Sequence, residues 1–408
     1  MFKRKKTVTA VDLSDSKACG VIAEVKNGQI EVLASHLIEG GGLKKGLVVD
    51  IGATAGILKD LLKELKKGAG DSSDSIYINV SGSHLDTGNC HGAVMISNNR
   101  GVVLKKDVRS VISSAHVHGI ALDRMPLHTL VRDYIIDEHK GIINPLKMHA
   151  RKIEVDLLVV TGISNYIKNL KRSVNQAGYQ IKEMVTSGLP PFYSVLEEEE
   201  RKTGVVLIDI GAGLTEIAFF HEEKLKKLAV IPKGGDDITE SISKRLKVSA
   251  SYAEEIKKRY GCALVGSEEA VEEVVLKDSN GNVKVINKNE INEAVKRSLD
   301  KILSRVEAKL EEMDCLQSAP CGIVLTGGTA LLDSMIEVAQ KTFVLPVRLG
   351  SPRGFQISKA LNSPIWSNCL GLAKYALIKE TASPQTAARL KPLAFIKEKT
   401  ADLFSDYF

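Results

Sequence analysis

The chain has 408 residues, of which 44% are hydrophobic and 26% charged, a composition typical of a globular protein with two to four domains. Its 56 basic and 50 acidic residues give a net charge of +6, which is too small for this length to indicate a nucleic-acid partner. Only 5% of the residues are aromatic, which also disfavours a surface that stacks single-stranded bases.

The six cysteines lie far apart and form no Cys-x-x-Cys pair, so we expect reduced thiols of a cytosolic protein. His116 and His118 form a His-x-His pair without an evident third ligand, which favours a surface or core role over metal binding. The N-terminus, MFKRKK, has no apolar signal core, and no apolar run is long enough to predict a membrane-spanning helix.

Two stretches of the sequence predict the same order of strands and turns. Residues 7–13 form an apolar run that ends near Asp12, followed by a polar turn and two further predicted strands joined at Asn27-Gly28, a strong hairpin signal. Residues 205–231 repeat this order, with Asp209 at the end of the first strand. The repetition predicts an internal duplication.

The turn after Asp209 is built from small residues, Gly211, Ala212 and Gly213. Glycines let backbone N–H groups approach an anion, and a carboxylate at a strand end can hold a magnesium ion. Two such hairpins facing a cleft could hold the phosphates of a nucleotide from both sides. A plain β-hairpin with an Asp at its tip is the alternative for either copy.

Residues 47–54, LVVDIGAT, resemble a phosphate loop more than residues 8–15 do. However, an amphipathic helix over 55–67 follows directly and no strand returns, so we interpret Asp50 as structural.

Three later stretches could also face a nucleotide. Gly234-Gly235 precedes a helix whose free N–H groups could bind an anion, although a simple N-cap explains the same residues. A helix over 250–260 carries Glu254 and Lys257 one turn apart, ordinarily a surface ion pair. The strand 323–325 runs into Gly327-Gly328-Thr329, with a helix expected from about Ala330.

Two Asp-tipped hairpins followed by a late Gly-Gly-Thr turn resemble the actin/hexokinase/Hsp70 ATPase superfamily. Within it the chain is similar to the bacterial cell-division family FtsA over nearly its whole length. The similarity is carried by NVSGSHLDTGNCHGAVMIS (79–97), GIINPLKMHARKIEVDLLVVTG (141–162), KGGDDIT, AEEIKKRYGCA and LTGGTALLD. The segment 79–162 is the most discriminating, because actin and the rod-shape protein MreB carry a different subdomain elsewhere.

The resemblance implies an α/β actin-like ATPase fold, with two duplicated α/β domains around a nucleotide cleft and an FtsA-type inserted subdomain. The expected parts are a first actin-like subdomain (1–80 and 163–203), the inserted subdomain (81–162), a second actin-like subdomain (204–235 and 321–379), a further subdomain (236–320), a linker (380–391) and a terminal amphipathic helix (392–408).

The resemblance also implies ATP and Mg²⁺ as ligands, with Asp12 and Asp209 flanking the metal ion. The residues expected at the phosphates are Ser14, Ser16, Lys17, Gly211, Gly213 and Thr215. Those expected around ribose and base are Gly234, Gly235, Glu254, Lys257, Gly327, Gly328 and Thr329.

Both phosphate loops depart from the family pattern. In the first loop Ser14 replaces a glycine and Asp15 replaces a hydroxyl residue. In the second loop Ala212, Leu214 and Glu216 replace the usual Gly, Thr and Asp. A carboxylate near phosphates is repulsive unless it turns away or helps the cation. We therefore expect ATP binding with weak or no hydrolysis, and no residue that positions the attacking water can be identified.

The terminal stretch 392–408 has the spacing of an interfacial amphipathic helix. Its membrane-facing residues are expected to be Leu393, Phe395, Ile396, Leu403, Phe404, Tyr407 and Phe408. Acidic residues balance its lysines, so attraction to anionic lipid is expected to be weak. The alternative is a helix that docks on its own protein.

By resemblance, the chain polymerises and anchors the ring of the tubulin-like protein FtsZ to the cytoplasmic face of the membrane at the division site, together with other division proteins. The FtsZ tail is expected to dock near 236–320, with Lys296 and Arg297 as candidate contacts or simply a solvated helix face. The alternatives are a PilM-like adaptor of a pilus assembly platform, and a sugar kinase or phosphatase of the same superfamily.

Overall fold

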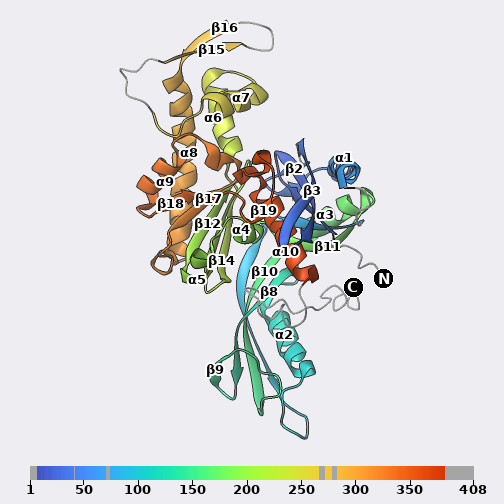
Figure 1. Ribbon diagram of the computed structural model, residues 1–408. Helices are drawn as coiled ribbons and strands as arrows, with labels where there is room; N and C mark the ends of the chain where they lie inside the picture. The colour runs from blue at the N-terminus through green and yellow to red at the C-terminus, as the bar shows by residue number, and fades with distance from the viewer. Residues whose placement is uncertain (1–6, 41, 70–73, 266–271, 278–282, 382–408) are drawn as a thin grey trace. The chain divides into compact units, whose positions relative to one another are not determined.

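The computed structural model describes residues 7–40, 42–69, 74–265, 272–277 and 283–381 (Figure 1). These residues form two compact units, one from the chain up to residue 85 together with 165–381, and the other from residues 86–164. The second unit corresponds to the segment in which the sequence predicts an inserted subdomain. No helix among the described residues has the length and apolar character needed to cross a bilayer.

The larger unit contains two sheets that share the order of five strands. In each sheet three antiparallel strands of a meander are followed by two parallel strands, and the first sheet has one further short strand at the other end of its meander. The first sheet contains β11 (Gln180–Thr186), β6 (Ser75–Val80), β1 (Thr7–Leu13), β2 (Lys17–Lys26), β3 (Gln29–Glu39) and β19 (Phe355–Gln356). The second contains β14 (Lys224–Ile231), β13 (Thr215–His221), β12 (Val205–Ile210), β17 (Ile323–Thr326) and β18 (Val347–Leu349). The shared order agrees with the duplication that the sequence predicts.

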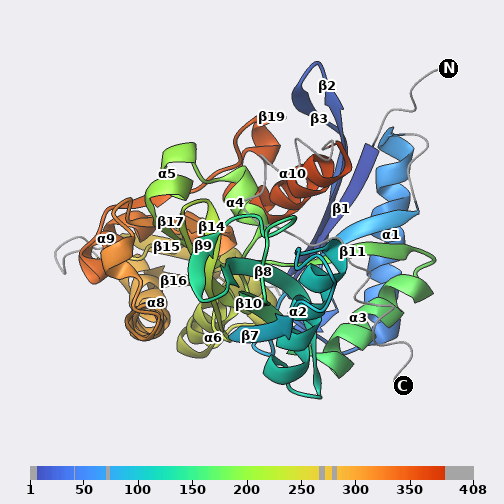
Figure 2. The same ribbon diagram turned by 90° about the horizontal axis from the view of Figure 1, so that it is seen from below.

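Helices cover both faces of the first sheet. α1 (Ile51–Ala69) packs on β2 and β3 through a stripe of buried leucines, as its amphipathic pattern predicts. α10 (Ser367–Thr381) packs on β1, β2 and β6, and Figure 2 shows α1 and α10 on opposite sides of β1. α3 (Ser164–Gln176) and the short α4 (Pro190–Ser194) complete this part of the unit.

The second sheet shares one hydrophobic core with the helices that follow it. The longest is α8 (Lys288–Glu312), whose apolar residues are buried along its whole length. The other helices of this core are α6 (Gly235–Leu246), α7 (Ala250–Tyr260) and α9 (Met335–Phe343), whereas the short α5 (Glu198–Thr203) precedes the sheet and buries none of its residues. β15 (Glu273–Lys277) and β16 (Val283–Asn287) pair as antiparallel strands.

The predicted helix start near Ala330 is wrong. A 3₁₀ helix, η2 (Gly328–Leu331), follows the Gly-Gly turn, and regular α-helix begins only at Met335 in α9. Ser334 has a left-handed backbone with φ of 59°, which breaks the run between the two helices. Gly328 and Thr329 therefore belong to a single tight 3₁₀ turn rather than leading into a long helix.

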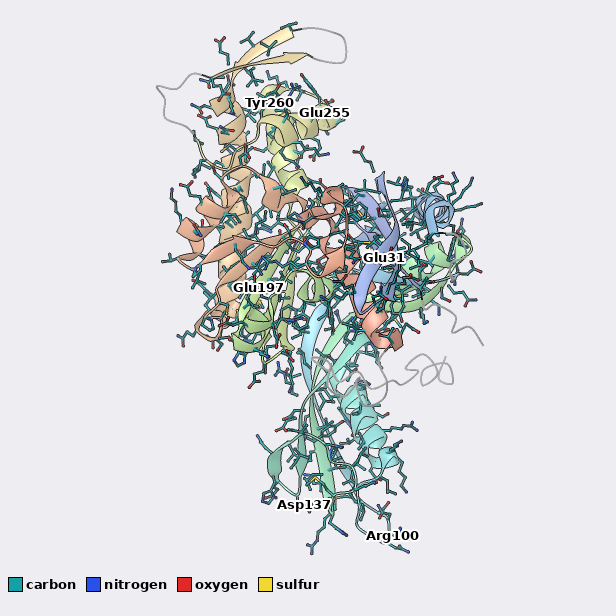
Figure 3. All side chains as sticks on the ribbon, viewed as in Figure 1. Glu31, Arg100, Asp137, Glu197, Glu255 and Tyr260 are labelled. Carbon is teal, nitrogen blue, oxygen red and sulfur yellow. The ribbon has the colours of Figure 1, made fainter. Side chains whose placement is uncertain are left out.

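The smaller unit is an antiparallel sheet covered by one helix. Its strands are β7 (Asp86–Met95), β10 (Lys152–Ile163), β8 (Arg124–Ile136) and β9 (His139–Ile142), and α2 (Lys105–Gly119) packs mainly on β7. The β8–β9 turn contains Asp137, whose carboxylate accepts backbone N–H bonds from Arg151 and Lys152 (Figure 3). His116 bonds the Thr129 hydroxyl.

Gly92 sets how closely α2 approaches β7. A Cβ atom at this position would lie 2.3 Å from the Val111 carbonyl oxygen and 2.6 Å from the Ala115 nitrogen, both backbone atoms of α2. We expect Gly92→Ala to destabilise residues 86–164 by about 1–3 kcal/mol, because helix and strand must separate. Hydrogen exchange of the α2 amides measures this loss of local stability.

Gly88→Ala is the matched control, because a Cβ atom there meets nothing within 4 Å in the same strand. If the α2 amides are equally protected from hydrogen exchange in the two variants, Gly92 does not set the distance between α2 and β7.

Candidate functional site

The strand ends of the two sheets line one cavity of about 900 Å³ in the larger unit, within the size range of small-ligand sites. Twelve of the predicted nucleotide residues line it: Asp12, Ser14, Ser16, Lys17, Asp209, Gly211, Gly213, Glu254, Lys257, Gly327, Gly328 and Thr329. The lining thus joins residues that are more than 300 positions apart in the sequence.

Asp12 lies at the end of β1 and is 4% exposed. Its Oδ1 accepts a hydrogen bond of 2.7 Å from Asn79 Nδ2, and Asn79 also accepts one from the Leu13 N–H. Burial raises the pKa of Asp12 to about 6, and the positive charge of Lys17 offsets part of that shift. Asn79, which the sequence did not identify, therefore fixes the orientation of this carboxylate.

Asp209 holds the equivalent place at the end of β12, and Glu216 pairs with it across the β12–β13 ladder. Burial, followed by the charge of Asp12, raises the pKa of Asp209 to about 7. Burial and the charge of Asp209 raise the pKa of Glu216 well above its usual range, although a 2.7 Å bond from the Ser81 hydroxyl opposes the shift. A cation in the cavity would relieve this repulsion.

No group of three or more His, Cys, Asp or Glu side chains among the described residues has the spacing of a metal site by itself. Two buried carboxylates in a cavity of this size nevertheless fit a Mg²⁺ ion that keeps several waters and completes its shell with phosphate oxygens. The donor chemistry therefore fits the cofactors that the sequence predicts.

The second phosphate loop is supported from behind by α6. Gly235 N donates to Gly211 O over 2.9 Å, and Asp236 N donates to Ala212 O over 2.8 Å. A Cβ atom on Gly234 would lie 2.5 Å from Ala212 O, so only glycine admits this contact. Gly234 and Gly235 shape the loop and do not belong to the described lining of the cavity.

Thr215 is also turned away from the cavity that the described residues line. Its hydroxyl donates over 2.9 Å to Lys233 O, and the side chain is fully buried. Its predicted place at the phosphates does not match this geometry, because β13 alternates and directs Glu216 rather than Thr215 toward the cleft.

Glu254 and Lys257 of α7 form a more buried pair than their surface-like spacing suggests (Glu255 and Tyr260 mark this helix in Figure 3). Lys257 Nζ lies 2.6 Å from Glu254 Oε2 and also donates to Thr239 Oγ1 over 2.8 Å. Burial raises the pKa of Glu254, but the ammonium of Lys257 more than offsets it, so the pKa is lowered overall. This wall of the cavity therefore carries a compensated pair of charges.

Lys17 and the segment before α10 form the opposite wall. Lys17 Nζ donates over 2.7 Å to Ile365 O, in the 3₁₀ helix η4 (Pro364–Trp366). Asn368 lines the cavity, is 8% exposed, and its Oδ1 has no hydrogen-bond partner among the described residues. Sequence reasoning missed Asn368, because no local motif marks it.

Asp15 turns away from the cavity centre toward the small hairpin of β4 (Leu43–Lys44) and β5 (Leu47–Val48). Its carboxylate accepts backbone N–H bonds from Lys45 at 2.7 Å and Gly46 at 2.8 Å. Asp50, just beyond this hairpin, is exposed and accepts from Ala53 N at the start of α1, which agrees with the structural role predicted for it.

The residues predicted to contact FtsZ do not line the cavity. Lys296 and Arg297 are exposed on α8, and Lys296 Nζ lies 2.6 Å from Asp300 Oδ2. The predicted membrane helix, residues 392–408, lies outside the described residues.

Two family models match the chain. The model described as cell division protein FtsA matches residues 206–371, and the SHS2 domain inserted in FtsA matches residues 82–161.

Among solved structures, the type IV pilus PilM-PilN complex is similar with a TM-score of 0.63 at 19% identity, over 91% of this chain and 98% of that one. MreB5 of Spiroplasma citri bound to ADP is similar with a TM-score of 0.54 at 14% identity, over 92% and 97%. At these identities the likeness shows the fold alone, and it confirms the predicted actin-like architecture.

Relatives found by sequence show to which family of this fold the chain belongs. The FtsA of Pseudomonas aeruginosa is 34% identical over 92% of this chain and 90% of its own length. The FtsA of Streptococcus pneumoniae is 30% identical over 90% of this chain and 79% of its own, and that of Escherichia coli 28% over 91% and 90%. The pilus-adaptor alternative is therefore not favoured: the chain belongs to the FtsA family of cell-division proteins.

Proposed function

We propose that this chain binds ATP with Mg²⁺ in the cavity, polymerises, and anchors the FtsZ ring to the cytoplasmic membrane. The observation that carries the nucleotide part is the convergence of two duplicated hairpins, each tipped by a buried aspartate, on one cavity. The ADP-bound structure of MreB5, which shares the fold, supports the same use of the cavity.

In this proposal Asp12 and Asp209 hold the magnesium ion, which neutralises phosphate charge when bound. Ser14, Ser16 and Lys17 from the first loop, and Gly211 and Gly213 from the second, lie at the phosphates. Glu254, Lys257, Gly327, Gly328 and Thr329 line the part of the cavity left for ribose and base.

Hydrolysis is proposed to be weak or absent. Glu216 replaces the family's aspartate, and its carboxyl is bonded by Ser81 and has a raised pKa. A buried carboxyl whose pKa is raised, and whose oxygen already accepts a hydrogen bond from Ser81, is less available as a general base. Filament formation, FtsZ binding and membrane attachment are inferred from family membership.

Asp209→Asn tests the carboxylate pair in the absence of nucleotide. With its pKa raised from 3.8 to about 7, folded Asp209 binds more protons than unfolded Asp209 between these pH values, so stability falls as pH rises through this window. We expect the variant to be more stable than the parent by about 1–4 kcal/mol at pH 8 and by less at pH 5. Thermal unfolding at the two pH values measures the difference.

The same variant is expected to lose most of the Tm increase that Mg-ATP gives the parent protein, because one cation ligand is gone. Asp74→Asn removes an exposed carboxylate that pairs with Lys66, and should leave both readouts unchanged. A stabilised variant that still responds fully to Mg-ATP would contradict metal binding by Asp209.

The membrane proposal predicts that a chain ending at Ser383 fails to float with liposomes, whereas the full chain floats. Avidity makes the effect strongest under conditions where the full chain polymerises. Substituting Phe404 by Glu in the full chain should give the same loss, and unchanged flotation of both variants would favour a helix docked on the protein itself.

The partner proposal predicts that a Lys296→Glu, Arg297→Glu double variant binds an FtsZ tail peptide at least about fivefold more weakly by calorimetry. A Lys301→Glu, Arg305→Glu double variant on the same helix makes the same charge change and is the matched control. Equal weakening by both pairs would indicate a general charge effect rather than a docking site.

A further inference from the structure

The β4–β5 hairpin turn is an anion site that the chain itself fills. Lys45 and Gly46 have left-handed backbones, with φ of 52° and 76°, and their adjacent N–H groups both point at the Asp15 carboxylate. Consecutive N–H groups in such a turn form a concave site for a negatively charged oxygen group. The carboxylate of Asp15 thus occupies a place that is built for an anion.

This anion site borders the nucleotide cavity. Asp15 and Gly46 both line it, as does Gly213 of the second phosphate loop. Asp15 packs so closely on Gly213 that a Cβ atom there would lie 1.6 Å from Asp15 Oδ2. The carboxylate therefore lies between the first phosphate loop, the second phosphate loop and the hairpin turn.

Lys45 holds the hairpin against the second loop. Its Nζ donates to Gly213 O over 3.0 Å and to Asp237 Oδ2 over 3.2 Å. The Lys45 ammonium is thus paired with Asp237 and Gly213 O next to the two backbone N–H groups, where the two phosphate loops approach each other. Ammonium and backbone N–H donors are both suited to a phosphate group.

We propose that the Lys45 and Gly46 N–H groups, with the Lys45 ammonium, form a subsite for the terminal phosphate of a nucleoside triphosphate, and that Asp15 occupies this subsite as an internal competitor. The inference rests on the proposed nucleotide binding. A triphosphate must displace the Asp15 carboxylate or bind beside a like charge, whereas a diphosphate does neither. Asp15 therefore lowers the preference of the chain for ATP over ADP.

Asp15→Asn and Asp15→Thr test this competition by isothermal calorimetry with Mg-ATP and Mg-ADP on the full chain. We expect both variants to raise ATP affinity relative to ADP by at least about fivefold, because one negative charge leaves the terminal-phosphate subsite. Asp50→Asn is the matched control: it removes one negative charge just beyond the same hairpin from an exposed carboxylate that also accepts a backbone N–H. It should leave the ATP-to-ADP ratio unchanged.

Lys45→Ala tests the donors of the subsite. We expect it to lower the affinity for ATP at least about fivefold more than the affinity for ADP. Lys44 is an exposed lysine of the same hairpin, so Lys44→Ala should leave the ratio of the two affinities unchanged. These outcomes together would support the subsite.

If the Asp15 variants bind ATP and ADP more weakly by the same factor, Asp15 serves only to hold the hairpin. The inference is then overturned, while the proposal that the chain binds nucleotide stands. An unchanged ratio overturns it in the same way. If the parent chain binds neither nucleotide, the proposed function itself fails, which the same titrations reveal before any variant is compared.

Discussion

Two sheets with matching strand order carry three carboxylates into one cavity, and the burial of these carboxylates, to which the charge of Asp12 adds at Asp209 and that of Asp209 adds at Glu216, is the constraint on which the site depends. Asp12 and Asp209 occupy equivalent strand ends, so the duplication itself generates the pair, and Glu216 adds a third charge from the neighbouring strand. Without a cation the pair holds protons at higher pH than exposed carboxyls do. The arrangement is more favourable for a cation-bound cavity than for an empty one.

Much of this could be predicted from the sequence, because the relevant signals are local. Apolar runs ending at Asp12 and Asp209, followed by small or polar turns, define strand–turn–strand units whatever surrounds them. The amphipathic helices α1 and α8 follow from their spacing for the same reason. Twelve predicted nucleotide residues do meet at the cavity.

The features that the sequence did not predict depend on contacts between distant segments. The orientation of Asp15 is decided by N–H donors about thirty residues later, and that of Asp12 by Asn79 in a neighbouring strand. Gly234 and Gly235 look like an anion-binding helix start, but the loop they support lies between them and the cavity. The family resemblance places Thr215 at the phosphates, whereas its side chain is buried and donates to Lys233 O, and the alternation of β13 directs Glu216 to the cavity instead.

Two of the departures from the family loops, Asp15 and Glu216, are each hydrogen-bonded by a segment outside the two phosphate loops. Glu216 is bonded by Ser81, which follows β6, and Asp15 by the β4–β5 hairpin. Each contact links one phosphate loop to another segment of the cavity wall. Altered loops of this kind retain a defined conformation even where the substituted side chains oppose phosphate binding.

Trp366, the only tryptophan of the chain, lies in η4 beside the carbonyl that accepts the Lys17 ammonium, and only 9% of it is exposed. Trp366 does not itself belong to the described lining of the cavity, but Ile365 and Asn368 on either side of it do. Its fluorescence therefore offers a direct test, on the unlabelled chain, of whether a ligand entering the cavity changes the packing of this segment.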